Sequence, residues 1–135
     1  MNDLGSRRAL VIATEPTATE LVAALAVHAD LEVRVLTPSR SEPFDDLLVV
    51  PDLVLLEREL PDLDGLTVLE RLRQAPGGTH VPIVMIARTW DAPSLERAAR
   101  LRANSCLRWP EAGADRVAWL FEVSRFWIGI NELAR

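Results

Sequence analysis

Side chains that commonly carry out chemistry are few in this 135-residue chain, and most of them stand alone. His28 and His80 are isolated and belong to no metal-ligand pattern. Ser94 and Ser105 have no histidine at a spacing that would support nucleophilic catalysis. The acidic segment at residues 51–65 therefore remains as the main candidate for a functional site.

This segment belongs to a regular alternation of strands and helices. Apolar or alternating runs predict five strands, at residues 9–13, 32–36, 53–56, 81–87 and 106–108. Helices are predicted from Thr17 (with Glu20 at the spacing of a capping box), over 44–50, from 66 to near 76, over 91–103 and over 115–133. Such alternation indicates a parallel sheet covered on both faces, with its site beyond the carboxyl ends of the strands.

The sharpest motif is PDLVLLERELPDLDG, at residues 51–65. It resembles the strand–loop–helix signature of response-regulator receiver domains, in which an acceptor aspartate is followed by a proline and a glycine. Glu57 stands at the acceptor position, with Pro61 and Gly65 at the family's spacing.

The resemblance extends from Ala9 to about Leu133 and includes strand VPIVMIA and the strand end Leu107–Pro110. It implies an α/β fold of the flavodoxin-like (βα)5 type, a doubly wound, five-stranded parallel sheet with strand order 2-1-3-4-5. We expect one receiver-like domain over residues 1–135, with its core at about 8–133 and no output domain.

The receiver family transfers a phosphoryl group with the help of Mg²⁺, and the resemblance locates each part of that machinery. At the positions that match the acidic metal-binding pair, this chain has Ala13 and Thr14, and at the acceptor aspartate it has Glu57. The threonine or serine that binds the phosphoryl oxygen corresponds to Ala87, and the lysine that pairs with the phosphoryl group corresponds to Trp109. The aromatic switch position corresponds to Cys106. Magnesium needs carboxylate oxygens, so we expect the metal site to be lost and no cofactor to bind. Transfer depends on positioning and on stabilising charge, so we expect a non-enzymatic, phosphorylation-independent receiver.

Two of these positions have alternative interpretations. Glu57 is either a fixed charge that mimics a phosphorylated aspartate or a drifted residue, and its single charge favours drift. If Glu57 is buried, Arg58 or Arg88 would offset its desolvation. Trp109 either fills the vacated pocket or lies on the surface, and we expect a cis Trp109–Pro110 bond.

A receiver that accepts phosphate on another acid in the 57–64 region, such as Asp62 or Asp64, is the alternative function. A small α/β enzyme with its own site is disfavoured, because no nucleophile–base or metal constellation is present.

The segment Val123–Ile130 (VSRFWIGI) resembles the phytochrome-associated single-domain response regulators of bacteria, whose last helix carries a Phe-Trp pair and leads into a dimerisation tail. The final helix is also more apolar than one contact with a sheet requires. The resemblance therefore predicts an interface with a second copy, or with a histidine kinase or other signalling protein. Its candidate residues are Trp119, Val123, Phe126, Trp127 and Ile130.

Composition narrows the partners further. The net charge of -5 argues against nucleic-acid binding, which needs a basic surface. No apolar run approaches the ~20 residues of a membrane span. Cys106 is the single cysteine and fits a reducing cytoplasm.

Overall fold

A computed structural model describes residues 7–37, 50–111 and 114–130. In chain order the elements are β1 (Arg7–Ile12), α1 (Thr17–Leu25), β2 (Leu31–Leu36), β3 (Leu53–Glu57), α2 (Gly65–Gln74), β4 (Ile83–Ala87), α3 (Ala92–Arg100), β5 (Ser105–Arg108), α4 (Ala114–Ser124) and the π-helix η1 (Arg125–Ile130). The five predicted strands are therefore confirmed, each with bounds close to those expected.

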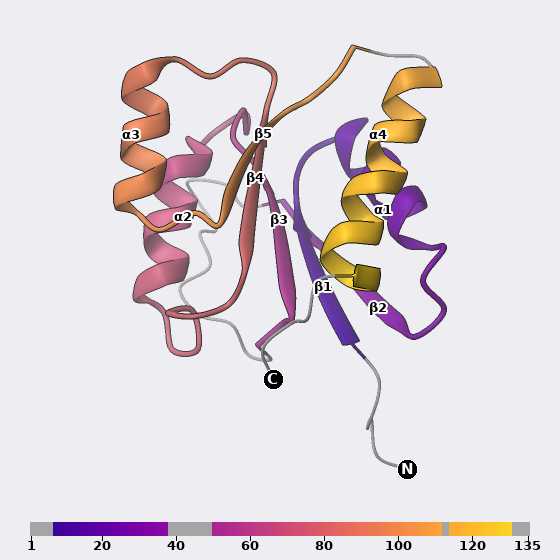
Figure 1. The fold of residues 1–135 in the computed structure, drawn as a ribbon. Helices are drawn as coiled ribbons and strands as arrows, with labels where there is room; N and C mark the ends of the chain where they lie inside the picture. The colour runs from indigo at the N-terminus through magenta and orange to yellow at the C-terminus, as the bar shows by residue number, and fades with distance from the viewer. Residues whose placement is uncertain (1–6, 38–49, 112–113, 131–135) are drawn as a thin grey trace.

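All strand pairs are parallel, and their order is β2-β1-β3-β4-β5, as the resemblance implied (Figure 1). In the register, Ile12 lies opposite Leu56, and Glu57 lies opposite Ile86. The carboxyl ends of β1, β3 and β4 consequently meet along one edge of the sheet, which is where a functional site is expected.

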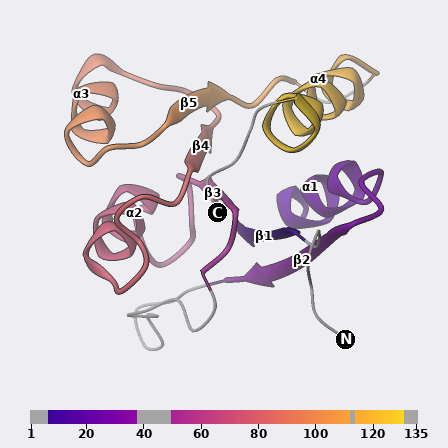
Figure 2. The same ribbon diagram turned by 60° about the horizontal axis from the view of Figure 1, so that its bottom comes forward.

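Helices cover both faces of the sheet (Figure 2). Helices α1 and α4 cover one face, over a core that includes Val11, Leu55 and Ile86. Helices α2 and α3 cover the other, over a core that includes Ile12 and Leu56. Neighbouring residues of a strand point to opposite faces, so the residues of β1 from Ala9 onward and those of β3 are buried on both sides of the sheet. All of these residues are apolar except Glu57.

The cap of α3 at Asp91 agrees with the sequence, the cap of α2 at Asp64 was not predicted, and the start of α1 differs from the prediction. Asp64 accepts a hydrogen bond from the Leu66 amide at the start of α2, and Asp91 caps α3 through the Ser94 amide. The predicted capping box of α1 is wrong. Thr17 is already the first helical residue, and the N-cap residue before it is Pro16, whose side chain accepts no hydrogen bond.

The carboxylate of Glu15 takes over at that end of α1. It accepts from the amide of Thr19 at 3.1 Å and from its hydroxyl at 2.6 Å. Glu20, the expected second member of the box, instead forms an ion pair with α4.

Other sequence-based expectations concern a helix over 44–50, the length of the last helix and a cis peptide bond. The predicted helix over 44–50 lies outside the described residues apart from Val50. The last helix changes from α to π geometry at Arg125, and the described part ends at Ile130. The cis peptide bond among the described residues is Glu15–Pro16, so the cis Trp109–Pro110 prediction is wrong.

Among the described residues, no helix is long and apolar enough to cross a membrane.

Candidate site at the carboxyl ends of the strands

Glu57 ends β3, and its side chain turns inward rather than toward solvent. The residue is only 6% exposed. Its Oε1 atom accepts hydrogen bonds from the backbone amide of Thr14 at 3.0 Å and from the Thr14 hydroxyl at 3.2 Å. The longer glutamate side chain thus links the ends of β3 and β1 directly.

The loop after Glu57 is held tightly by Gly65. The Gly65 amide donates to the Arg58 carbonyl at 2.9 Å, and a Cβ at position 65 would lie 2.5 Å from the Glu57 carbonyl oxygen. Any side chain there would collide with the backbone that carries the acid. The glycine of the motif is therefore required for the close approach of α2 to the end of β3.

Two other strand-end positions, Ala13 and Ala87, carry only a methyl side chain. Ala13 is fully buried and Ala87 is 1% exposed. Neither offers an oxygen to a metal or a hydroxyl to a phosphoryl group.

The predicted arginine partners of Glu57 lie elsewhere, so that prediction is wrong. Arg58 donates to the Thr89 carbonyl and lies 5.4 Å from the Trp90 ring centre. The backbone amide of Arg88 donates to the carboxylate of Glu59, at 3.0 and 3.2 Å. The hydrogen bonds of Glu57 in the described structure both come from Thr14 and both reach Oε1, so hydrogen bonds rather than an ion pair stabilise this oxygen.

Trp109 is buried, 7% exposed, and packs on the face of the sheet covered by α1 and α4. The ring centres of Trp109 and Trp119 lie 5.6 Å apart, and the two ring planes are nearly perpendicular. The Arg116 guanidinium lies 4.6 Å from the centre of the Trp109 ring. Its backbone amide donates to the Ala87 carbonyl at 2.7 Å. A surface position for Trp109 is therefore wrong, since its indole is part of the core.

Arg116, the cation that lies over the Trp109 ring, is held by two further groups. It donates twice to the Pro110 carbonyl, at 2.9 and 2.7 Å, and once to each carboxylate oxygen of Glu20, at 3.2 and 3.4 Å. Its position ties the loop after β5 to α1 rather than projecting a charge toward Glu57.

The sequence model of the response regulator receiver domain matches residues 9–118. The chain belongs to the receiver domain family.

Two curated relatives give the range of sequence similarity. Over 122 residues the receiver is 36% identical to the positive alginate biosynthesis regulatory protein of Pseudomonas aeruginosa, covering 86% of this chain and 46% of that protein. Over 82 residues it is 29% identical to the probable methanogenesis regulatory protein FilR2 of Methanothrix harundinacea, covering 61% and 53%. The chain therefore spans about half the length of these relatives.

Solved structures confirm the receiver fold. The phosphorylated cyanobacterial phytochrome response regulator RcpA superposes with a TM-score of 0.81 at 19% identity, covering 96% of this chain and 99% of that one. The Mn²⁺-bound response regulator Rcp1 gives 0.77 at 19% identity, covering 96% and 99%. Both superpositions cover nearly the whole chain, and at this identity they show the shared fold.

The residues present here do not fit the divalent metal that such a receiver holds. The positions where the sequence predicts the metal-binding pair hold a buried Ala13 and Thr14, and Thr14 donates both its polar hydrogens to Glu57. The described residues contain no group of three or more histidine, cysteine or acidic side chains that could hold a metal ion. Among Ala13, Thr14 and Glu57, only Glu57 offers a carboxylate, and its Oε1 atom already accepts both hydrogen bonds from Thr14, whereas Mg²⁺ prefers several free oxygen ligands.

The candidate interface residues of the last helix differ in exposure. Phe126 is 50% exposed and stacks edge-on with Trp127 at 5.4 Å. Trp119 and Trp127 are partly buried against the core, and Val123 is partly exposed. The side chain of Ile130 lies outside the described residues.

Sequence reasoning missed three features of this region. Thr14 is the hydrogen-bonding partner of Glu57, and its β-hydroxyl next to a strand end could have suggested that role. Trp90 ties the β4–α3 loop to β5 by donating from Nε1 to the Leu107 carbonyl at 2.9 Å. Finally, all 15 basic residues of the sequence are arginines, so no lysine from another position can replace the one missing at Trp109.

Proposed function

We propose that this receiver acts in signal transduction through protein–protein contact and independently of phosphorylation. The observation that carries the proposal is the carboxylate of Glu57, which is buried and bonded to Thr14. A nucleophile must approach phosphorus in line and without obstruction. Oε1 of Glu57 is buried and already accepts two hydrogen bonds.

The surroundings of Glu57 support the same proposal. The phosphoryl group that forms during transfer carries dispersed negative charge, and catalysis consists mainly of stabilising that charge. Ala13 and Ala87 supply no ligand, and the Arg116 guanidinium is engaged by Glu20, Pro110 and the Trp109 ring. The chain is accordingly not an enzyme, and Mg²⁺ is not part of its action.

Phosphorylation is tested by incubating the chain with acetyl phosphate and Mg²⁺ and measuring its intact mass. We expect no phosphoryl adduct, either in the wild-type chain or in Glu57→Asp, because the aspartate would still lack the metal pair and the lysine. An adduct on the wild-type chain that hydroxylamine removes would refute phosphorylation independence.

The alternative receiver, which accepts phosphate on another acid in the 57–64 region, makes a different prediction. Asp64 already caps α2, and one of its oxygens lies 4.0 Å from Arg97, so it is not a free nucleophile. Asp62 is exposed. An adduct that disappears in Asp62→Asn and persists in Glu57→Gln would favour the alternative.

The contact surface that we propose lies on the last helix, where the chain forms a homodimer or meets a histidine kinase or another signalling protein in the cytoplasm. Phe126, half-exposed beside Trp127, supports this choice, since exposed aromatic residues often dominate interfaces. The net charge of -5 makes nucleic acid an unsuitable partner. Sedimentation velocity of the wild-type chain and of Phe126→Ser tests the dimer directly.

A further inference from the structure

Strand β2 forms one edge of the sheet in the described structure, with β1 on its inner side and no strand on its outer side. The carbonyls of Asp30 and Leu36 accept hydrogen bonds from the amides of Arg7 and Ala13, at 3.0 and 3.3 Å. Successive residues of a strand turn their backbone groups to opposite sides. The even-numbered residues of β2 therefore bond toward β1, and the odd-numbered residues face outward.

The outward-facing residues, Leu31, Val33 and Val35, supply the backbone groups of this edge. The amide of Leu31 is used within the chain, since it donates to the His28 carbonyl at 3.2 Å. The amides of Val33 and Val35 and the carbonyls of all three residues point to the side where the described sheet has no strand. An extended segment of a second chain can bond to such an edge.

The side chains of β2 make this edge complementary to itself. Glu32 and Arg34 are exposed and flank Val33. In an antiparallel pair of β2 strands centred on Val33, each Glu32 lies opposite the Arg34 of the second copy. A shift by two residues would place Glu32 opposite Glu32, or Arg34 opposite Arg34, and like charges in that position are destabilising. Charge thus selects one register.

The same register also matches the outward backbone groups. Val33 faces Val33 of the second copy, and the two residues exchange hydrogen bonds between their amides and carbonyls. Each Val35 amide faces the Leu31 carbonyl of the other copy. A shift by one residue would instead place an outward-facing residue opposite one whose backbone is bonded to β1.

Both charged residues have room for these contacts. Arg34 forms no ion pair within the part of the chain that the structure describes. Glu32 lies 3.7 Å from Nε of Arg8, and its side chain is still 63% exposed, so a second cation can approach it.

An apolar groove beside β2 would be covered by the pairing. It measures about 380 Å³ and is lined by Glu15, Ala18, Thr19, Val22, Ala23 and Val35. Val35 is 42% exposed there. The pairing brings Leu31 of the second copy opposite Val35, on the face that α1 covers, so that apolar surface of both copies leaves water.

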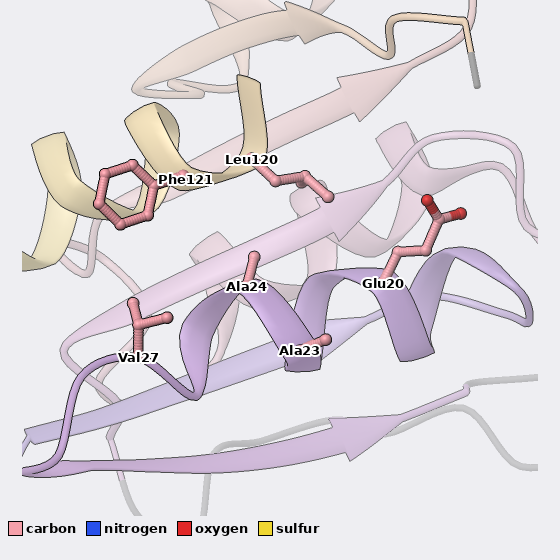
Figure 3. A pocket seen from close by; sticks show the side chains of 6 residues that line it. All are labelled: Glu20, Ala23, Ala24, Val27, Leu120 and Phe121. Carbon is pink, nitrogen blue, oxygen red and sulfur yellow. The ribbon is translucent and has the colours of Figure 1, made fainter. Parts of the chain in front are cut away.

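We propose that β2 pairs antiparallel with β2 of a second copy, about a two-fold axis at Val33, and joins the two sheets into one. A two-fold dimer uses the same surface on both copies, as a self-complementary strand requires. Helix α1 lies between β2 and α4 (Figure 3), so this interface is separate from the last helix and goes beyond the contact proposed there.

The experiment measures the dimer dissociation constant by sedimentation velocity at concentrations from about 1 to about 500 μM. Arg34→Glu places like charges opposite each other, and we expect the constant to rise by about tenfold or more. The double variant Glu32→Arg, Arg34→Glu restores opposite charges and should return the constant to within about threefold of the wild-type value. Arg100→Glu on α3, where the side chain is 69% exposed, is the matched control and should leave the constant unchanged.

Val35→Pro tests the backbone contact independently of charge. Proline is accepted on an edge strand where the missing amide faces outward, so the substitution removes a bond to the second copy and none to β1. We expect the dissociation constant to rise by about tenfold. Circular dichroism and a thermal melt establish that each variant is folded.

The outcomes separate this inference from the contact on the last helix. If Arg34→Glu and Val35→Pro dissociate the dimer, the double variant restores it and Phe126→Ser has no effect, the β2 pairing is supported and the dimer of the last helix is wrong. If Phe126→Ser dissociates the dimer while Arg34→Glu and Val35→Pro do not, the β2 pairing is wrong and the last helix remains the interface. A chain that stays monomeric throughout overturns both dimers.

Discussion

At the scale of single residues, the hydroxyl of Thr14 is the group that makes a buried Glu57 tolerable. A carboxylate accepts hydrogen bonds more strongly than a neutral oxygen does, and the loss of a bond to a buried charge costs about 1.5–3 kcal/mol. Thr14→Val keeps the backbone amide and the side-chain shape but removes the hydroxyl. We expect it to lower the free energy of unfolding by about 2 kcal/mol, measured by urea titration.

Thr37→Val is the control for this substitution. The Thr37 hydroxyl also bonds near the end of β1, but it donates to the neutral carbonyl of Ala13 at 2.9 Å. Its loss should cost about 1 kcal/mol or less. Equal losses in the two variants would show that the Glu57 carboxylate gains nothing special from Thr14.

His28, in the turn after α1, should make stability depend on pH. Burial lowers the pKa of His28 below its usual 6.5, Arg7 lowers it further, and Asp30 partly opposes them. The unfolded chain therefore binds the proton more readily, so stability is complete above the unfolded pKa and declines as pH falls below about 6.5.

The pH dependence is measured by urea unfolding at several values between about pH 7.5 and about pH 5. We expect His28→Asn to flatten the decline in this range. His80 is exposed, and His80→Asn should leave the slope of the wild-type chain unchanged. An unaltered slope in His28→Asn would assign the effect to other groups.

At the scale of elements, one arginine joins α2 to the loops before β4 and β5. Arg73, 8% exposed, donates to the carbonyls of Gly78, Val81 and Arg102 and to Oδ1 of Asn104. Arg102 holds the left-handed φ of 66°, which a non-glycine residue adopts at some cost. Burial lowers the pKa of Arg73, and Arg102 adds to the lowering, but a guanidinium remains charged in proteins.

Arg73→Lys should therefore be strongly destabilising despite its conserved charge. An ammonium has three donors and lacks the planar fork that reaches these acceptors together, so we expect a loss of about 2–3 kcal/mol in urea unfolding. Arg71, on the same helix, has a buried Nη1 atom without a hydrogen-bond partner in the described structure. Arg71→Lys should cost about 1 kcal/mol or less, and a similar loss in both variants would contradict the role assigned to Arg73.

Element by element, the sequence predicts what depends on local pattern. The apolar strands, the cap at Asp91 and the turn at Gly65 follow from residue type and spacing. The cap of α1 could not be predicted, because the choice between Thr17 and Glu15 depends on how the chain enters the helix. The partner of Glu57 could not be predicted either. Thr14 lies 43 residues before Glu57 in the sequence, and the two side chains meet only when β1 pairs with β3.

At the scale of the whole molecule, the receiver fold and the receiver site depend on different residues. The sheet is stabilised by apolar side chains buried on both faces, and these are present in all three central strands, β1, β3 and β4. The chemistry of the site needs only a few charged groups at the strand ends, and those can change without loss of the core. The fold could therefore be predicted from the sequence with more detail than the function.

This separation leads to a prediction about divalent metal. A ligand that binds only the folded state stabilises it in proportion to the logarithm of its concentration over its dissociation constant. Since the strand ends lack the carboxylate pair, about 10 mM Mg²⁺ should shift the melting temperature by no more than about 1 °C relative to EDTA. The triple variant Ala13→Asp, Thr14→Asp, Glu57→Asp restores the oxygen ligands, and its melting temperature should rise with Mg²⁺. A clear rise in the wild-type chain would show that its own residues hold the metal and that the phosphorylation-independent function must be reconsidered.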